Sequence, residues 1–329
     1  MSEGTPNIPP DDQALVDGAA AGDVEAVQRL LKQGVSANAR GRQKHLTWDH
    51  TALMFAAEHG RAEVVRELLA AGADVAAVNR GHAADGGGGS QALHFAAAKG
   101  HVDVCDLLLD AGANPNVLGR YCRTPLTEAC YNARAEVIRL LLSRGADVKL
   151  KSRRKDYEAP AFAAVTARDP QTLRLVLDAG ADPNATGGRD WSPLQLAASR
   201  DDVESDARIE MMDALIKAGA AVDLADRDGT TALQVAVVYN NVKAVRFLLA
   251  AGADATQTLN DQPLVARARQ YERRAGEDLA GDLSKLSDEH ARKFRAHHEN
   301  RRRDAQAIIE LLEEAAGAAT AAAAQQGTR

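Results

Sequence analysis

Residues Gln91 to Asn116 decide the fold, and they read Gln-Ala-Leu-His-Phe-Ala-Ala-Ala-Lys-Gly-His-Val-Asp-Val-Cys-Asp-Leu-Leu-Leu-Asp-Ala-Gly-Ala-Asn-Pro-Asn. The first half places leucine and alanine at helical spacing on one face, and Gly100 can end that helix in a left-handed turn. The second half places valine and leucine on one face and ends at Gly112. The stretch therefore predicts two short helices packed back to back.

So short a pair of helices cannot bury its apolar faces alone, so the pattern requires neighbours. Glycine followed by a small apolar residue closes a leucine-rich run at intervals of 33 to 40 residues along the chain. These closures lie at Gly34, Gly72, Gly112, Gly145, Gly180, Gly219 and Gly252. Helix openings of the type Thr-Pro-Leu recur in the same register, for example at Thr124-Pro125-Leu126 and Ser192-Pro193-Leu194. With a period near 33 residues, the chain resembles the ankyrin-repeat family from about Gln13 to Leu312.

The resemblance implies an all-α ankyrin-repeat solenoid of about eight helix–turn–helix units, the last interrupted by a helical insertion. We expect a disordered N-terminal arm over residues 1–12 and repeats 1–7 over residues 13–257. A C-terminal capping repeat over 258–316 contains a charged insertion at 272–303, and an Ala-rich disordered tail follows at 317–329.

The charged insertion allows two interpretations. No glycine or proline falls between Ser287 and Ala316, so one helix of about 30 residues is possible, with a shorter Leu279–Leu286 helix beside it as a hairpin. Its apolar end, Ile308 to Leu312, is expected to pack near Phe247 and Leu248. A disordered loop is the alternative, because few apolar residues and many charges also describe disorder.

Composition narrows the class of protein. The chain has 329 residues, 45% of them hydrophobic, and a net charge of −6, so no global charge favours nucleic acid. The first twelve residues lack an apolar core and a basic start, and no run approaches the roughly 18 apolar residues that span a bilayer. We therefore expect a soluble, cytoplasmic monomer.

Catalytic and metal-binding patterns are weak. The three cysteines, Cys105, Cys122 and Cys130, show no metal-ligand spacing and are interpreted as two small hydrophobic residues and one loop thiol. His298-Glu299 begins a zinc motif, but Arg302 stands where its second histidine belongs. The resemblance gives His94 a structural role, bracing a turn. We expect no enzyme activity, no cofactor and no metal.

The remaining signal is on the surface. In ankyrin-like solenoids the loops between repeats project as fingers, and partners bind there and on the first helices. Aromatic and arginine side chains dominate interface energies, so those in the fingers and at the ends of first helices are the candidate contacts. The predicted partner-binding residues are Trp48, Tyr121, Tyr131, Arg153, Arg154, Lys155, Tyr157, Trp191 and Tyr239. For Trp48 and Trp191, simple packing over a hairpin is the alternative.

The basic run from Lys149 to Lys155 is compatible with a solvated finger, with an acidic protein surface and, less well, with nucleic acid. We therefore favour a non-catalytic scaffold or interaction module that binds a protein partner, with an acidic surface as the expected partner chemistry. The alternative is a regulatory or immunity subunit that inhibits or positions an enzyme.

Overall fold

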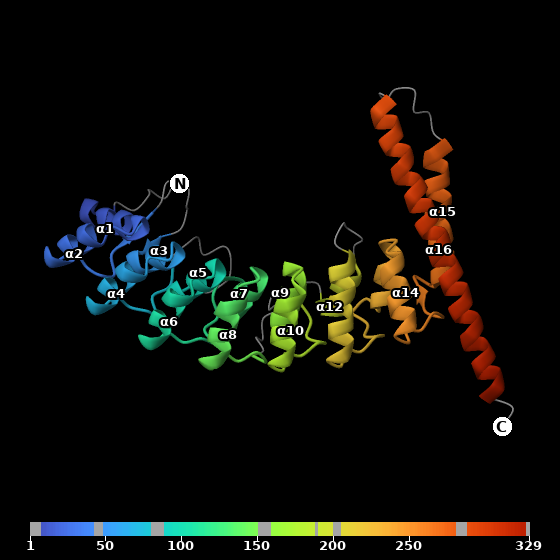
Figure 1. Ribbon diagram of the computed structural model, residues 1–329, viewed down its shortest axis with the longest axis horizontal. Helices are drawn as coiled ribbons and strands as arrows, with labels where there is room; N and C mark the ends of the chain where they lie inside the picture. The colour runs from blue at the N-terminus through green and yellow to red at the C-terminus, as the bar shows by residue number, and fades with distance from the viewer. Residues whose placement is uncertain are drawn as a thin grey trace, which may run out of the picture. The chain divides into compact units, whose positions relative to one another are not determined.

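The computed structural model describes residues 8–42, 49–79, 89–150, 159–187, 190–199, 205–280 and 288–326. It divides into two compact units, Met1–Asp182 (unit 1) and Pro183–Arg329 (unit 2). Each unit is built from helix pairs, and each pair is one repeat (Figure 1).

Unit 1 contains repeats 1 to 5, arranged as two layers of helices. The first helices are α1 (Pro10–Ala21), α3 (Ala52–Glu58), α5 (Ala92–Lys99), α7 (Pro125–Tyr131) and α9 (Pro160–Ala167). The second helices are α2 (Val24–Lys32), α4 (Ala62–Ala70), α6 (Val102–Asp110), α8 (Ala135–Ser143) and α10 (Pro170–Asp178). Each first helix packs on the next first helix, and each second helix on the next second helix. The expected all-α ankyrin architecture is confirmed.

In the core of unit 1, alanine lines the first helices and leucine lines the second helices. Alanines such as Ala56 and Ala96 are fully buried on the first helices, where the absence of a long side chain lets neighbouring helices approach closely. Leucines such as Leu68, Leu108 and Leu141 are fully buried on the second helices and supply the bulk of the apolar volume.

The fingers connect the repeats, and in their described residues the regular elements are short. Strands β1 (Arg40–Gly41) and β2 (His50–Thr51) pair antiparallel in the first finger, with Arg40 opposite Thr51. A single 3₁₀ turn, η2 (Arg120–Cys122), forms the finger between α6 and α7.

Asparagine side chains clamp some neighbouring fingers together. Asn38 donates to the Gly72 carbonyl at 3.4 Å and accepts from the Asp74 amide at 2.8 Å. Asn116 makes the same two bonds to repeat 4, at 3.0 Å to Gly145 and 2.7 Å from Asp147. The equivalent positions, four residues after the closing glycine, hold Ala76 and Lys149 in repeats 2 and 4. In unit 1 this clamp therefore joins repeat 1 to 2 and repeat 3 to 4.

Unit 2 contains repeats 6 to 8. Its elements are α11 (Pro193–Ala198), α12 (Ser205–Lys217), α13 (Ala232–Val238), α14 (Val242–Ala250), the paired strands β3 (Thr258–Leu259) and β4 (Gln262–Pro263), α15 (Leu264–Ala280) and α16 (Asp288–Gln326). Helix α15 packs on α13, and α16 packs on α14, so the last pair keeps the order of a repeat. Ile308 and Leu312 of α16 are buried, as is Leu248 of α14.

The boundaries differ from the sequence expectation at three places. Helix α1 begins at Pro10, inside the arm expected to be disordered, because proline is favoured in the first turn of a helix. Helix α15 runs through residue 272 to Ala280, so the charged segment starts as the end of a repeat helix. Helix α16 continues to Gln326 through the expected disordered tail, since alanine has the highest helix propensity.

The long helix α16 is the feature that departs most from a repeat. Its 39 residues correspond to about 58 Å at 1.5 Å per residue, and it pairs with α15 as a hairpin (Figure 1). Arg269 lies 2.5 Å from Glu313 across this pair, and Gln306 donates to Glu272 at 3.0 Å. Residues 281–287, which include part of the expected Leu279–Leu286 helix, lie outside the described residues. Among the residues the structure covers, no helix is long and apolar enough to cross a membrane.

Two glycines of repeat 3 allow a test of how the repeats are held in register. Gly100 and Gly112 both have left-handed backbones, with φ of 87° and 90°. A Cβ at Gly112 would meet nothing within 4 Å, but one at Gly100 would lie 2.8 Å from Cδ of Arg134. Arg134 belongs to the next repeat, and its Nε donates to the Ala98 carbonyl at 3.2 Å.

We expect Gly112→Ala to cost only the left-handed backbone, about 1–2 kcal/mol. Gly100→Ala should cost about 1 kcal/mol more, because Arg134 must move and lose its bond to Ala98. In an Arg134→Ala background, where that bond is already absent, Gly100→Ala should cost no more than Gly112→Ala does. Thermal and urea unfolding of these variants and of Arg134→Ala alone measure this, and equal losses for Gly100→Ala and Gly112→Ala would contradict it.

Candidate protein interface

The finger between α6 and α7 has a strained backbone. The Gly119 amide donates to the Arg123 carbonyl at 2.8 Å and closes a turn of three residues. Tyr121 and Cys122 in that turn both adopt left-handed backbones, with φ of 54° and 57°. Such conformations cost about 1–2 kcal/mol each for residues other than glycine. As a result, Cys122 points into the fold and is 4% exposed, whereas Tyr121 is 49% exposed.

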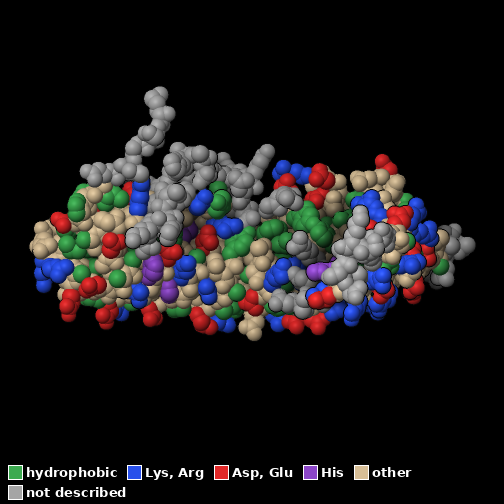
Figure 2. Space-filling view, turned by 90° about the horizontal axis from the view of Figure 1, so that it is seen from above, with side chains coloured by type: hydrophobic (Ala, Val, Ile, Leu, Met, Phe, Trp, Pro, Cys, Tyr) green, Lys and Arg blue, Asp and Glu red, His purple; other side chains and the backbone are tan. Residues whose placement is uncertain are grey.

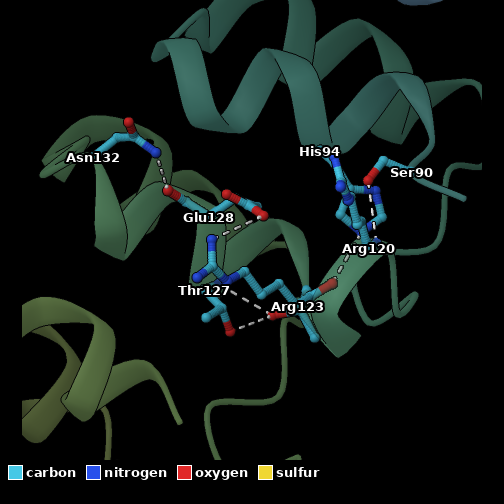
Figure 3. Close-up of polar contacts among 8 residues, drawn as sticks. Ser90, His94, Arg120, Arg123, Thr127, Glu128 and Asn132 are labelled. Atoms are coloured by element: carbon cyan, nitrogen blue, oxygen red, sulfur yellow. Dashed lines mark hydrogen bonds and ion pairs between the residues drawn. The ribbon is translucent and has the colours of Figure 1, made fainter. Parts of the chain in front are cut away.

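His94 of α5 holds this finger in place. Its Nδ1 accepts a hydrogen bond from the Gln91 amide at 3.1 Å, so Nε2 carries the proton and donates to the Arg123 carbonyl at 3.2 Å (Figure 3). Burial lowers the pKa of His94 to about 4, so the ring is neutral at pH 7. A Cβ at Gly119 would lie 2.6 Å from Nε2, so only glycine lets the finger approach the ring this closely. The expected turn-bracing role of His94 is confirmed.

Two glutamines in unit 2 make the same pair of hydrogen bonds in their repeats that His94 makes in repeat 3. Gln195 accepts from the Ser192 amide at 2.7 Å and donates to the Thr230 carbonyl at 2.7 Å. Gln234 accepts from the Thr231 amide at 3.0 Å and donates to the Thr258 carbonyl at 2.8 Å. Neither glutamine was predicted as a functional residue, although each stands three residues after a Ser or Thr cap, where a capping-box residue belongs.

Arginine and tyrosine side chains alternate along the same finger and the end of α7. The Arg120 guanidinium lies 4.6 Å from the centre of the Tyr121 ring, and Arg123 lies 5.5 Å from that same ring. Arg123 also lies over Tyr131, 3.9 Å from its ring centre. We call Arg120, Tyr121, Arg123 and Tyr131 the Tyr–Arg ladder. Cation–π contacts of this kind contribute about 0.5–1 kcal/mol each at exposed sites.

An ion pair and a backbone hydrogen bond hold the Tyr–Arg ladder to the elements beside it. Glu128 of α7 lies 3.8 Å from Arg123, and its backbone carbonyl accepts from Asn132 at 2.8 Å (Figure 3). The Arg120 amide donates to Ser90 Oγ at 3.3 Å, which fixes the finger to the one before it. Two guanidinium groups thus stand on a rigid support, an arrangement that suits recognition of a carboxylate.

The structure brings together only part of the predicted contact set. Tyr121 and Tyr131 were predicted as separate contact residues, and in the structure the Arg123 guanidinium lies over both rings. Arg120 and Arg123 were missed; the spacing Arg-Tyr-Cys-Arg at a finger tip was the available signal. Trp48, Arg153, Arg154, Lys155 and Tyr157 lie outside the described residues.

The predicted residues of unit 2 occupy separate places in that unit. Trp191 is partly buried, and its carbonyl accepts from Gly187 at 2.9 Å in a turn where Asp190 is left-handed. Asp190 lies 2.7 Å from Arg227, which ties this finger to the next. Tyr239 follows α13 directly and is 44% exposed. Its ring is therefore available for contact on unit 2.

The cysteines and the metal-ligand residue types are the remaining groups that could support chemistry. All three cysteines are buried and none forms a disulfide; Cys122 lies in a finger, as expected, with its side chain turned into the fold. Burial raises the pKa of Cys105 to about 12 and that of Cys130 further still, so both thiols stay protonated at neutral pH. Among the described residues, no three His, Cys, Asp or Glu side chains gather where a metal ion could bind.

Comparison with known proteins agrees with the fold. The family model described as ankyrin repeats (3 copies) matches residues 10–79, 78–152 and 161–258. This chain therefore belongs to the ankyrin-repeat family. The crystal structure of the human ASB11 ankyrin repeat domain is similar to it, with a TM-score of 0.58 and 23% identity over 73% of this chain and 98% of that one.

Curated relatives share the repeats within longer proteins. The E3 ubiquitin-protein ligase KEG of Arabidopsis thaliana is 31% identical over 248 residues, which cover 74% of this chain and 13% of the relative. The mitochondrial disaggregase of Bos taurus is 34% identical over 179 residues, covering 45% of this chain and 25% of the relative. The chain thus spans a quarter or less of the length of these two proteins.

The neutral His94 ring predicts a pH dependence of stability. Its pKa in the folded protein, about 4, lies below the ordinary value of 6.5, so protonation opposes folding. The stabilisation is complete above pH 6.5 and is lost as the pH falls from 6.5 towards 4, up to about 3 kcal/mol.

His94→Gln should keep both hydrogen bonds, as Gln195 and Gln234 do. Because glutamine does not titrate, the variant should lose less stability between pH 6.5 and pH 4. Gln195→His is the matched reverse change and should introduce a similar loss in unit 2. The measurement is the difference in thermal midpoint between pH 7.5 and pH 5 for each variant. An unchanged difference after His94→Gln would mean that other groups set the acid sensitivity.

Proposed function

We propose that this chain is a non-catalytic recognition module that binds a protein partner through the fingers and first helices of unit 1. The Tyr–Arg ladder is the observation that carries the proposal. Ankyrin repeats are protein–protein interaction modules, and membership of that family supports the same role here. Scaffolding, a cytoplasmic location and a monomeric state belong to this proposal as well.

The ladder has the properties of an interface centre. Tyrosine and arginine are among the residues that contribute most to binding free energy, and burying a large ring adds apolar area. The stacking of Arg120 and Arg123 on the tyrosines restricts their rotamers before a partner arrives. Binding then loses less side-chain entropy than at an unstructured surface, by about 0.5–1.5 kcal/mol for each side chain already held.

The chemistry of the ladder favours an acidic partner. Guanidinium groups form paired hydrogen bonds with carboxylates, and the flanking rings exclude water from one side of that contact. On the face drawn in Figure 2, acidic and basic side chains are interspersed, so no broad field of one sign covers that surface. We therefore expect a local carboxylate contact at the ladder.

Tyr121→Ala and Arg120→Glu should each weaken partner binding by at least tenfold, because each removes or reverses part of the ladder. Tyr121→Phe should bind nearly as well as the unchanged chain, since it keeps the ring under both guanidinium groups. Arg139→Ala is the control, because Arg139 is an exposed arginine on α8, one of the second helices, where it pairs with Glu136.

The partner is first recovered by affinity purification from the native cell with the full chain, and affinities are then measured by titration calorimetry. A scaffold should return several partners, whereas a dedicated regulatory or immunity subunit should return one. Retained affinity in Tyr121→Ala and Arg120→Glu, with intact helicity, would remove the ladder from the interface.

A further inference from the structure

A cavity lies on unit 2 between the second helices of repeats 6 and 7. Helices α12 and α14 pack side by side in this unit (Figure 1), and the space between them has a volume of about 550 Å³. Pockets that take small molecules usually have volumes of about 300–1,000 Å³. The cavity is therefore large enough for a small molecule.

An additional helical turn forms one wall of the cavity. Helix α12 has 13 residues and α14 has nine, and each ends two residues before the closing glycine of its repeat. The additional turn of α12 therefore lies at its N-terminal end. There Arg208 is buried and donates to the Leu196 and Ala197 carbonyls of α11 at 3.0 and 3.3 Å. These bonds hold the wall in place without a ligand.

The lining of the cavity combines an apolar floor with a charged rim. Ile209 of α12 and Phe247 of α14 line the cavity and are half-buried. The charged side chains of the lining are all exposed, and they are Asp206, Glu210, Lys243 and Arg246. A ligand can therefore bury an apolar body against the floor while it keeps a charged group at the rim.

The ion pairs of the rim determine which charge a ligand should carry. Lys243 Nζ lies 2.7 Å from Asp206 Oδ1, so these two charges neutralise each other, and Glu210 is likewise engaged in a polar interaction. Arg246 lies one turn further along α14 and forms no ion pair or side-chain hydrogen bond with any residue that the structure describes. Its guanidinium group is therefore available to an anion.

The Lys243–Asp206 pair also limits the size of the occupant. It bridges α12 and α14 at one end of the cavity, so a peptide lying along the space between the helices would have to break it. From Lys243 to Ala250, the last lining residue of α14, the helix rises about 10 Å. That length suits a molecule of two fused aromatic rings.

We propose that this cavity binds a small aromatic carboxylate, with its rings against Ile209 and Phe247 and its carboxylate on the Arg246 guanidinium. The rings bury apolar area and can stack on the phenylalanine, and a guanidinium offers paired donors to a carboxylate. The site lies on the second helices of unit 2 and does not depend on the interface proposed for unit 1.

The test titrates 2-naphthoate into the full chain labelled with ¹³C at the isoleucine methyl groups and follows the methyl NMR signals. Aromatic rings shift the signals of nearby methyl groups, so the Ile209 signal should move, whereas that of Ile138 in unit 1 should stay. The titration should saturate with a Kd below about 1 mM. The neutral analogue 2-naphthamide, which has the same shape, should bind about tenfold more weakly.

Arg246→Gln should weaken 2-naphthoate binding by about tenfold, because it removes the charged donors. Arg66→Gln is the matched control, since Arg66 is exposed at the same position of α4, six residues before the closing glycine, and should leave the affinity unchanged. Ala250→Asp should weaken binding by about threefold through repulsion of the carboxylate. Repeats 3 and 5 carry Asp110 and Asp178 at that position, so the fold accepts the change.

Three results would overturn the proposal. One is an Ile209 signal that does not move up to about 1 mM 2-naphthoate, or that moves no more than the Ile138 signal. Another is equal affinity for 2-naphthoate and 2-naphthamide. The third is unchanged affinity in Arg246→Gln, with circular dichroism confirming that each variant is folded. None of these results bears on the Tyr–Arg ladder, which the variants leave intact.

Discussion

The structure depends on side chains that reach from one repeat to a backbone carbonyl of the next. The helix pairs of repeats 1 to 5 are too short to bury their apolar faces alone, so each needs its neighbour at a defined offset. His94 bonds the Arg123 carbonyl, Asn116 bonds the Gly145 carbonyl and Arg134 bonds the Ala98 carbonyl. These contacts fix the offset at which the apolar faces meet.

The sequence predicted the parts of the fold that depend on local periodicity. The helix pairs, their closing glycines and the proline openings at Pro125 and Pro193 all follow from residues close to one another in the chain. The extents of α1 and α16 were missed, because a polar proline-bearing start and an Ala-rich end are compatible with both helix and disorder. Composition alone does not separate those two states.

The candidate interface was predicted only as separate residues. Tyr121 and Tyr131 were recognisable from their type and position, but their union through Arg123 depends on the left-handed backbones of Tyr121 and Cys122. Tyrosine and cysteine rarely adopt left-handed backbones, so the residue types alone do not predict that conformation. The family resemblance likewise gave the role of His94 but not the replacement of His94 by glutamine in unit 2. The same hydrogen bonds can be made by different side chains, so a motif search for histidine overlooks them.

The asparagine clamps have a consequence for the mechanics of unit 1. Because they join repeat 1 to 2 and repeat 3 to 4 but are replaced by Ala76 and Lys149 at the other two junctions, only the first and third fingers make this pair of hydrogen bonds in unit 1. The Tyr–Arg ladder lies at a clamped junction, between repeats 3 and 4. A load applied to its finger is therefore shared by two repeats through Asn116.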